Sequence, residues 1–170
     1  FEKSVESRPA ENPYRFYDGP PFITGTPHYG SLLSSIVKDV VPRYQTMLGK
    51  RVERVWGWDC HGLPIEQKVQ KKLGLESNKE IEESAGGIQG FIDECYAYTR
   101  DTSAEWSWYI DHIGRWVDME GAYRTMDQNY MESVMWVFKQ IWEKGYIYEG
   151  KRVSWYSWKL STPISNFEIA

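Results

Sequence analysis

The sequence has few cysteines, no long hydrophobic run and no excess of positive charge. Its 170 residues include only Cys60 and Cys95, whereas small secreted domains held together by disulfides usually carry more. No stretch of roughly eighteen apolar residues could cross a membrane, and no cationic leader precedes an apolar segment. We therefore expect two reduced thiols, no membrane association and a cytoplasmic location.

The charge balance limits the partners that this segment can hold by itself. There are 20 lysine and arginine residues against 24 aspartate and glutamate residues, which gives a net charge of -4. Neutralising phosphates requires clustered basic side chains, so any RNA partner is expected to bind mainly through other domains. The 41% apolar content is enough for one globular unit. Because the chain opens on Phe1 and 165–170 carry no terminating signal, both ends are expected to continue in a longer protein.

The order of apolar and turn-forming segments predicts an α/β fold. Residues 13–18 are aromatic-rich and end at the Gly-Pro-Pro turn 19–21, as expected for a strand followed by a tight loop. A helical apolar period covers 32–47, a second strand is predicted at 51–56, and a helix at 64–73 is followed by a glycine. This order is typical of a parallel sheet with flanking helices, which binds ligands beyond the carboxyl ends of its strands.

Two more helices and a hairpin are predicted in the second half. The helical period returns over 88–109. Asp127 is predicted to cap a helix that ends at Lys144. Residues 146–158 alternate aromatic and polar side chains around Gly150, which favours a hairpin or two short strands.

The turn between the first strand and its helix is the candidate anion site. The heptapeptide 25–31, GTPHYGS, has the glycine spacing of a P-loop, but Ser31 replaces the phosphate-binding lysine and excludes that motif. Unpaired N–H groups and the helix dipole at a helix start attract anions. His28 adds a donor there, and Gly30 lets a nucleotide approach the backbone. A lone loop histidine is usually structural, but this position favours a functional one.

Asp59 is the candidate for binding an ammonium group. It lies between Gly57 and Gly62 just past the second predicted strand, where a carboxylate faces the crevice of a parallel sheet. Capping of the helix that opens near Leu63 is an equally good use for this aspartate. A metal site at Cys60 is not expected, because no second pair of ligands accompanies its histidine neighbour.

Two motifs resemble signatures of the class I aminoacyl-tRNA synthetases. The segment DGPPFITGTPHYGSLL at 18–33 is similar to the family's first signature, in which a His-x-Gly-His tetrad binds the ATP phosphates. GWDCHGLPIE at 57–66 resembles the isoleucyl branch. The residues that the resemblance assigns to the ATP site are Thr24, His28, Gly30 and Ser31, the last three of them as the catalytic set. It also implies that Asp59 binds the isoleucine ammonium, with Gly19 and Pro20 as the wall of the amino-acid pocket.

Ser31 departs from the family's pattern, because it stands where the second histidine of the tetrad would be. A hydroxyl can donate a hydrogen bond but carries no positive charge. Loss of one preorganised donor in such a site can cost about 3 kcal/mol. The alternative interpretation is therefore a degenerate or truncated nucleotide-binding paralogue without ligase activity.

The resemblance covers nearly the whole chain and implies a reaction. Residues 1–160 would form the first half of a Rossmann-like catalytic domain, and 161–170 the start of the family's editing insertion. The implied enzyme is a monomer that joins isoleucine to Mg-ATP as isoleucyl-adenylate and transfers it to tRNA(Ile). Ser157 and Leu160 stand where some relatives have a zinc-binding cysteine pair, so no zinc is expected. The lysine-serine loop of the ATP site is missing, so the fragment alone is expected to have little or no activity.

Overall fold

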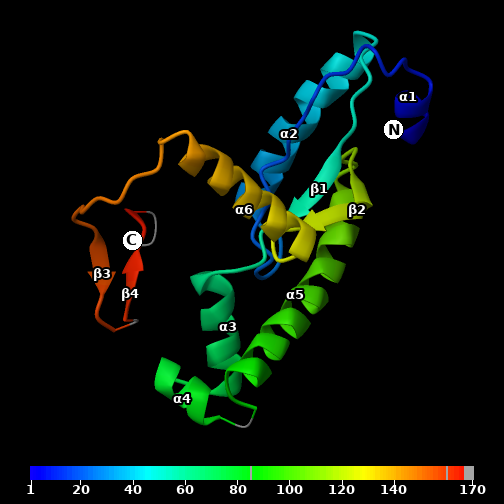
Figure 1. Ribbon diagram of the computed structural model, residues 1–170. Coiled ribbons are helices and arrows are strands. Elements are labelled where there is room, and N and C mark those ends of the chain that lie inside the picture. Colours follow the sequence, from blue (N-terminus) through cyan, green and yellow to red (C-terminus); the bar gives the residue numbers. More distant parts are fainter. Residues whose placement is uncertain (85, 160, 167–170) are drawn as a thin grey trace.

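A pair of parallel strands lies at the centre of the molecule (Figure 1). The computed structural model describes residues 1–84, 86–159 and 161–166. Strand β1 (Val55–Trp58) pairs in parallel with β2 (Asp118–Arg124), and Gly57 lies opposite Tyr123. The predicted α/β fold with a parallel sheet and flanking helices is thus confirmed. The second strand begins at Val55 instead of Arg51, and β2 was not predicted.

The segment before the first long helix runs beside β1, but the strand predicted at 13–18 is wrong. The segment forms isolated parallel bridges, one between Pro13 and Arg51 and one between Phe22 and Asp59. The stretch between these bridges includes three prolines when Pro13 is counted, and a proline donates no ladder hydrogen bond. Only Pro13 falls within 13–18, and residues 14–21 form no strand, although the two bridges keep the chain parallel to the segment around β1.

The four predicted helices are present as α2, α3, α5 and α6, with bounds that shift by a few residues, and the short helices α1 and α4 were not predicted. The helices are α1 (Glu2–Glu6), α2 (Tyr29–Met47), α3 (Leu63–Leu73), α4 (Asn78–Glu83), α5 (Gly87–His112) and α6 (Gln128–Glu143). Helix α3 ends at Gly74 in the left-handed conformation, as predicted. Asp127 takes the N-cap position of α6, but its carboxylate accepts from the N–H of Arg124 at 3.1 Å. Within the described residues, no helix has both the length and the apolar character that crossing a membrane requires.

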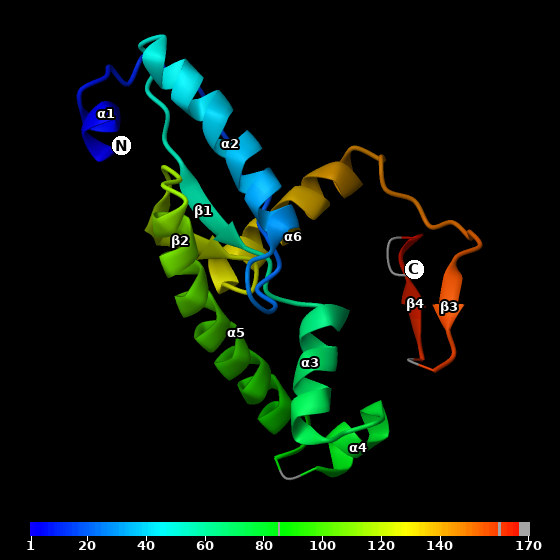
Figure 2. The ribbon, with the colours of Figure 1, turned by 180° about the vertical axis from the view of Figure 1, so that it is seen from behind.

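The hairpin lies further along the chain than predicted. Strands β3 (Trp155–Ser157) and β4 (Thr162–Ile164) pair antiparallel, and 146–154 contain no strand. Gly150 does not adopt the positive φ of a tight hairpin turn, whereas Ser161 does, with φ of 52°. Figures 1 and 2 show this hairpin standing apart from the helices, joined to α6 by an extended stretch. The predicted domain boundary between 160 and 161 falls partly on residues outside the described part.

Three tryptophans form the centre of the core between β1 and α5. Trp56 and Trp58 point to the same side of β1, since alternate strand residues share a face. Their ring centroids lie 6.0 and 5.7 Å from that of Trp106 on α5. All three side chains are buried. Ile23, from the loop that precedes α2, packs into the same buried cluster.

Helices α2 and α6 carry their large apolar side chains outward. The buried residues of α2 are Ser35, Pro42 and Thr46, and none of the residues of α6 is buried. Exposed large apolar residues of α2 are Tyr29, Leu33, Ile36, Val37, Val40, Val41, Tyr44 and Met47. The apolar stripe predicted over 32–47 therefore exists, but it does not contribute to the core of this chain.

Gly57 should tolerate no side chain. A Cβ atom at this position would overlap the ring of Tyr123 on the neighbouring strand. In the complete protein, Gly57→Ala is expected to lower the free energy of unfolding of this domain by about 2 kcal/mol, because the overpacked ring must move. Urea denaturation followed by tryptophan fluorescence measures the loss.

Gly150→Ala is the matched control, because a Cβ there would lie 3.5 Å from the Tyr148 ring, an ordinary contact distance. Equal unfolding midpoints for both variants and the unchanged protein would contradict the packing described for Gly57.

Candidate active site

A hollow of ≈ 360 Å³ brings together most of the residues predicted to form the site. It opens between the loop 19–22, the first turns of α2 and the tryptophan layer. The predicted residues that line it are Gly19, Pro20, His28, Gly30 and Ser31. Thr24 and Asp59 are not among its lining residues. The hollow thus joins the proposed amino-acid wall to the proposed phosphate site.

His28 is the N-cap residue of α2 and forms a reciprocal capping box with Ser31. The N–H of Gly30 donates to Nδ1 of His28 at 3.1 Å, and the N–H of His28 donates to Oγ of Ser31 at 3.3 Å. Because Nδ1 accepts, a neutral imidazole carries its proton on Nε2, which can donate to a ligand. The capping role of His28 is therefore compatible with the anion-binding role that the sequence predicts.

Gly30 is required by the position of the His28 ring. A Cβ atom on Gly30 would lie 2.9 Å from Cε1 and 3.1 Å from Nδ1 of that imidazole. A larger residue would push the ring off the helix start. The spacing of histidine and glycine in the motif thus has a steric cause, and access for a nucleotide at Gly30 stays a prediction.

A buried charge cluster beside the hollow was missed by the sequence analysis. The carboxylate of Asp18 is fully buried and pairs with Nη2 of Arg115 at 2.5 Å and with Nζ of Lys38 at 2.8 Å. Nζ of Lys38 also donates to the carbonyl of Gly19 at 2.5 Å. Both cations line the hollow, so its wall carries one positive charge beyond what Asp18 neutralises. Such a wall favours an anionic ligand.

The two cations differ in how visible they are in the sequence. Lys38 lies seven positions after Ser31, two helical turns further along the same face of the helix. The helical period could therefore have placed this lysine beside the site. Arg115 is 97 positions away from Asp18 in the chain, and no local pattern links them.

Asp59 lies at the carboxyl end of β1, beside the loop that lines the hollow. Its N–H donates to the carbonyl of Pro21 at 2.9 Å, and its carbonyl accepts from the N–H of Ile23 at 3.0 Å. Its side chain is half-buried. The alternative use as a helix cap is wrong, because Gly62 takes the N-cap position of α3 and no side chain caps that helix.

Thr24 belongs to a loop that is fastened to α5 instead of to the hollow. The neighbouring Gly25 accepts at its carbonyl from Nε1 of Trp106 at 3.2 Å. The N–H of Gly25 donates to the hydroxyl of Tyr98 at 3.3 Å. Thr24 itself is half-buried, and its assignment to the ATP site stays a prediction.

A second, smaller hollow of ≈ 290 Å³ contains both cysteines, and both are free thiols. Burial raises the pKa of Cys95 to about 11 and also raises the pKa of Cys60. Thiols of this kind stay protonated near neutral pH and are poor metal ligands. Within the described residues, no group of three or more His, Cys, Asp or Glu side chains could hold a metal ion. The absence of zinc stays a prediction, and Leu160, one of its two positions, lies outside the described part.

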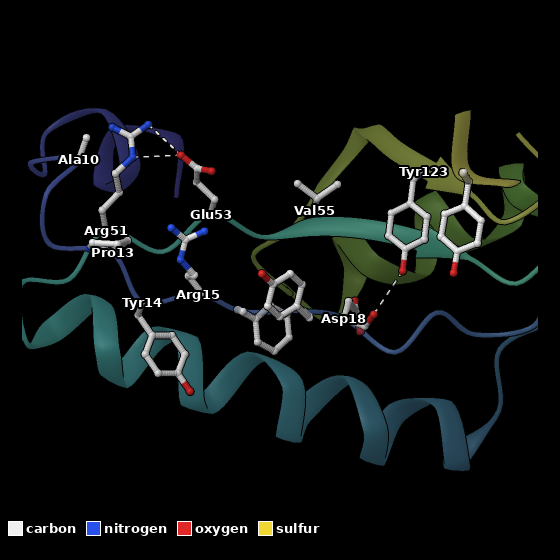
Figure 3. A pocket seen from close by; sticks show the side chains of 12 residues that line it. Ala10, Pro13, Tyr14, Arg15, Asp18, Arg51, Glu53, Val55 and Tyr123 are labelled. Atoms are coloured by element: carbon white, nitrogen blue, oxygen red, sulfur yellow. Dashed lines mark hydrogen bonds and ion pairs between the residues drawn. The ribbon is translucent and has the colours of Figure 1, made fainter. Parts of the chain in front are cut away.

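A larger hollow of ≈ 680 Å³ holds none of the residues predicted to form the site (Figure 3). It lies along the segment that leads to Asp18, and its charged residues Arg51 and Glu53 pair with each other at 3.0 Å. At its other end the Tyr123 hydroxyl donates to the backbone carbonyl of Asp18 at 3.3 Å. Burial raises the pKa of Tyr123, which keeps that donor protonated.

A parallel strand pair, a loop that runs beside it to the capped start of α2, and two cations near that start together define an α/β protein of the kind that binds ligands at the strand ends. The chain belongs to one particular family of that class. The family described as tRNA synthetases class I (I, L, M and V) matches residues 1–170.

Curated relatives of this chain are named isoleucine–tRNA ligases. It is 51% identical over 168 residues to isoleucine–tRNA ligase 2 of Pseudomonas fluorescens and 54% identical over 168 residues to isoleucine–tRNA ligase of Wolbachia pipientis wMel. It is 52% identical over 170 residues to the isoleucine–tRNA ligase of Protochlamydia amoebophila. These alignments cover 99 to 100% of the chain but only 15 to 16% of the relatives.

A solved structure shares the fold. The chain resembles the LeuRS of Agrobacterium radiobacter K84, crystallised in a ternary complex with tRNA and LeuAMS, with a TM-score of 0.58 and 20% identity. The match covers 81% of this chain and 15% of that one. At this identity the likeness supports the α/β architecture and nothing finer.

Cys95 should react slowly with alkylating reagents. With a pKa of about 11 against 9.0 for an ordinary thiol, it carries about 100-fold less thiolate at pH 8. Iodoacetamide labelling of the complete protein, with peptide mapping by mass spectrometry, should give a rate that rises about tenfold per pH unit until about pH 11.

The same protein unfolded in urea serves as the reference for Cys95, because its thiols are solvated there. Labelling of the folded protein at pH 7 to 8 as fast as that of the unfolded one would show that burial does not protect this thiol.

Proposed function

We propose that the protein containing this chain is an isoleucine–tRNA ligase, and that this chain supplies the first half of its adenylation site. The observation that carries the proposal is the identity of 51 to 54% to relatives of that name over nearly the whole chain. The hollow at the start of α2 adds a site of suitable shape and charge.

ATP, as its magnesium complex, would bind with its phosphates at the start of α2. First-turn N–H groups, the helix dipole and Nε2 of His28 all present positive charge to an anion there. Gly30 keeps the surface open to the nucleotide, and the hydroxyl of Ser31 remains engaged by the N–H of His28. Ser31 thus stabilises the helix start.

Isoleucine would bind beside the loop 19–21, with its ammonium on Asp59. Gly19 and Pro20 would wall the pocket. The substrate carboxylate attacks the α-phosphorus in line, the bond to the bridging oxygen breaks, and pyrophosphate leaves with its electron pair. No protein nucleophile is needed. The adenylate then gives its acyl group to a terminal ribose hydroxyl of tRNA, and AMP leaves.

The complete protein is needed for this reaction, since the chain spans only 15 to 16% of the length of its relatives. The second ATP-binding signature and most tRNA contacts would come from the rest of the polypeptide. The outward apolar faces of α2 and α6 offer it a surface to cover. One methylene separates isoleucine from valine and is worth about 1–3 kcal/mol, so editing would take place in another domain. We place this enzyme in the cytoplasm as a monomer.

Isoleucine-dependent exchange of labelled pyrophosphate into ATP tests the proposal in the complete protein. Asp59→Asn should raise the KM for isoleucine at least about tenfold with little change in the KM for ATP, because the ammonium loses its counter-charge. His28→Ala should lower kcat about 100-fold, because a donor to the charged phosphate is lost.

Matched controls exist for both changes. Asp111→Asn and His112→Ala alter the same residue types near the end of α5, both exposed, and should leave the exchange unchanged. No exchange with isoleucine, valine, leucine or methionine in a folded protein would favour the degenerate paralogue instead.

A further inference from the structure

We propose that the cluster of Lys38, Asp18 and Arg115 positions the amino-acid wall of the site, so that Arg115 is a positioning residue for isoleucine binding. This inference rests on the proposed adenylation function. Nothing in the motif pattern assigns a role to Arg115, and it is brought to the site only by the fold.

The cluster fixes the loop at its first residue. Asp18 directly precedes Gly19, and its carboxylate is held from two sides by Arg115 at 2.5 Å and Lys38 at 2.8 Å. Its backbone carbonyl accepts from Tyr123 at 3.3 Å. Lys38 reaches on to the carbonyl of Gly19 at 2.5 Å. The start of the loop therefore cannot shift without breaking a buried ionic contact.

The far end of the loop is fixed by a different contact. The N–H of Asp59 donates to the carbonyl of Pro21 at 2.9 Å. The residue expected to bind the ammonium and the wall expected to shape the pocket are thus tied together by the backbone. Pro20 lies between these two fixed ends, so the cluster and Asp59 together set the position of the amino-acid wall.

Arg115 is suited to positioning more than to contact with substrate. Its side chain is only 3% exposed, and its guanidinium lies 4.8 Å above the ring of Trp56. Nη2 of the Arg115 guanidinium is paired with Asp18, and the stacked ring of Trp56 limits rotation of the side chain. Without Arg115, the buried carboxylate would retain only Lys38, and that lysine would be drawn away from the carbonyl of Gly19.

The test is the split between the two Michaelis constants in pyrophosphate exchange by the complete protein. Arg115→Met is expected to raise the KM for isoleucine about tenfold and to change that for ATP less than about threefold, because a small displacement of the wall weakens binding. Arg115→Lys should recover part of the loss, since it keeps the charge. Lys38→Met should also raise the KM for isoleucine. Because this variant keeps the Asp18–Arg115 pair, it provides the test if Arg115→Met does not fold.

Arg54→Met is the control for a purely structural effect. Arg54 is also a buried arginine, 2% exposed, but it donates to the carbonyl of Val52 at 3.0 Å and to Oγ1 of Thr46 at 2.7 Å, away from the loop. It should lower the melting temperature without raising the KM for isoleucine.

Two results would overturn the inference while leaving the proposed function in place. One is an unchanged KM for isoleucine in both Arg115→Met and Lys38→Met. The other is a rise in the KM for ATP alone, which would make the cations direct phosphate ligands. An unmodified protein that exchanges with no amino acid would instead refute the proposed function, and the inference would fall with it.

Discussion

The carboxylate of Asp18 meets Arg115 and Lys38 at the point where the loop, α2, the segment after α5 and, through Tyr123, strand β2 come together. Removing one partner from a buried ion pair costs about 3–5 kcal/mol, because the remaining charge is left uncompensated. This contact therefore determines more than local stability. It also sets the position of the loop 19–22, which lines the hollow, relative to His28 at the start of α2.

Polar contacts also explain why α2 faces its apolar stripe outward. Arg43 pairs with Asp39 at 2.7 Å, donates to the carbonyl of Gly114 and lies 4.2 Å above the ring of Trp116. The carboxylate of Asp39 accepts from the N–H of Trp116 at 3.2 Å. The helix α2 is thus attached to the segment after α5 through the charged side chains of Asp39 and Arg43 and the ring of Trp116. Its apolar side remains available for other parts of the polypeptide.

Local patterns were enough to predict the four longest helices, whereas the short helices α1 and α4 were missed. Gly74 ends α3 as expected, and the turn at 25–31 opens α2, because caps and glycines act within one turn. Strand β2 was missed, since DMEGAYR has charge and glycine where a strand pattern needs apolar residues. The hairpin was displaced, because a left-handed turn at Ser161 has no sequence signal of the strength of a glycine.

The site shows the same division between local and distant causes. His28, Gly30 and Ser31 are neighbours in sequence, and their reciprocal hydrogen bonds follow from the helix start. The pairing of Asp18 with Arg115 joins segments 97 positions apart and depends on how α5 packs against β1. Sequence periodicity records which face of an element is apolar, but it does not record which distant charge that element will meet.

The adenylation site is tested most directly by a crystal structure of the complete protein with a non-hydrolysable isoleucyl-adenylate analogue. We expect the adenylate in the hollow beside α2, its ammonium on Asp59, its phosphate mimic next to His28, and the Asp18 cluster intact behind Gly19. An analogue bound elsewhere, with this hollow filled by other parts of the polypeptide, would contradict this expectation.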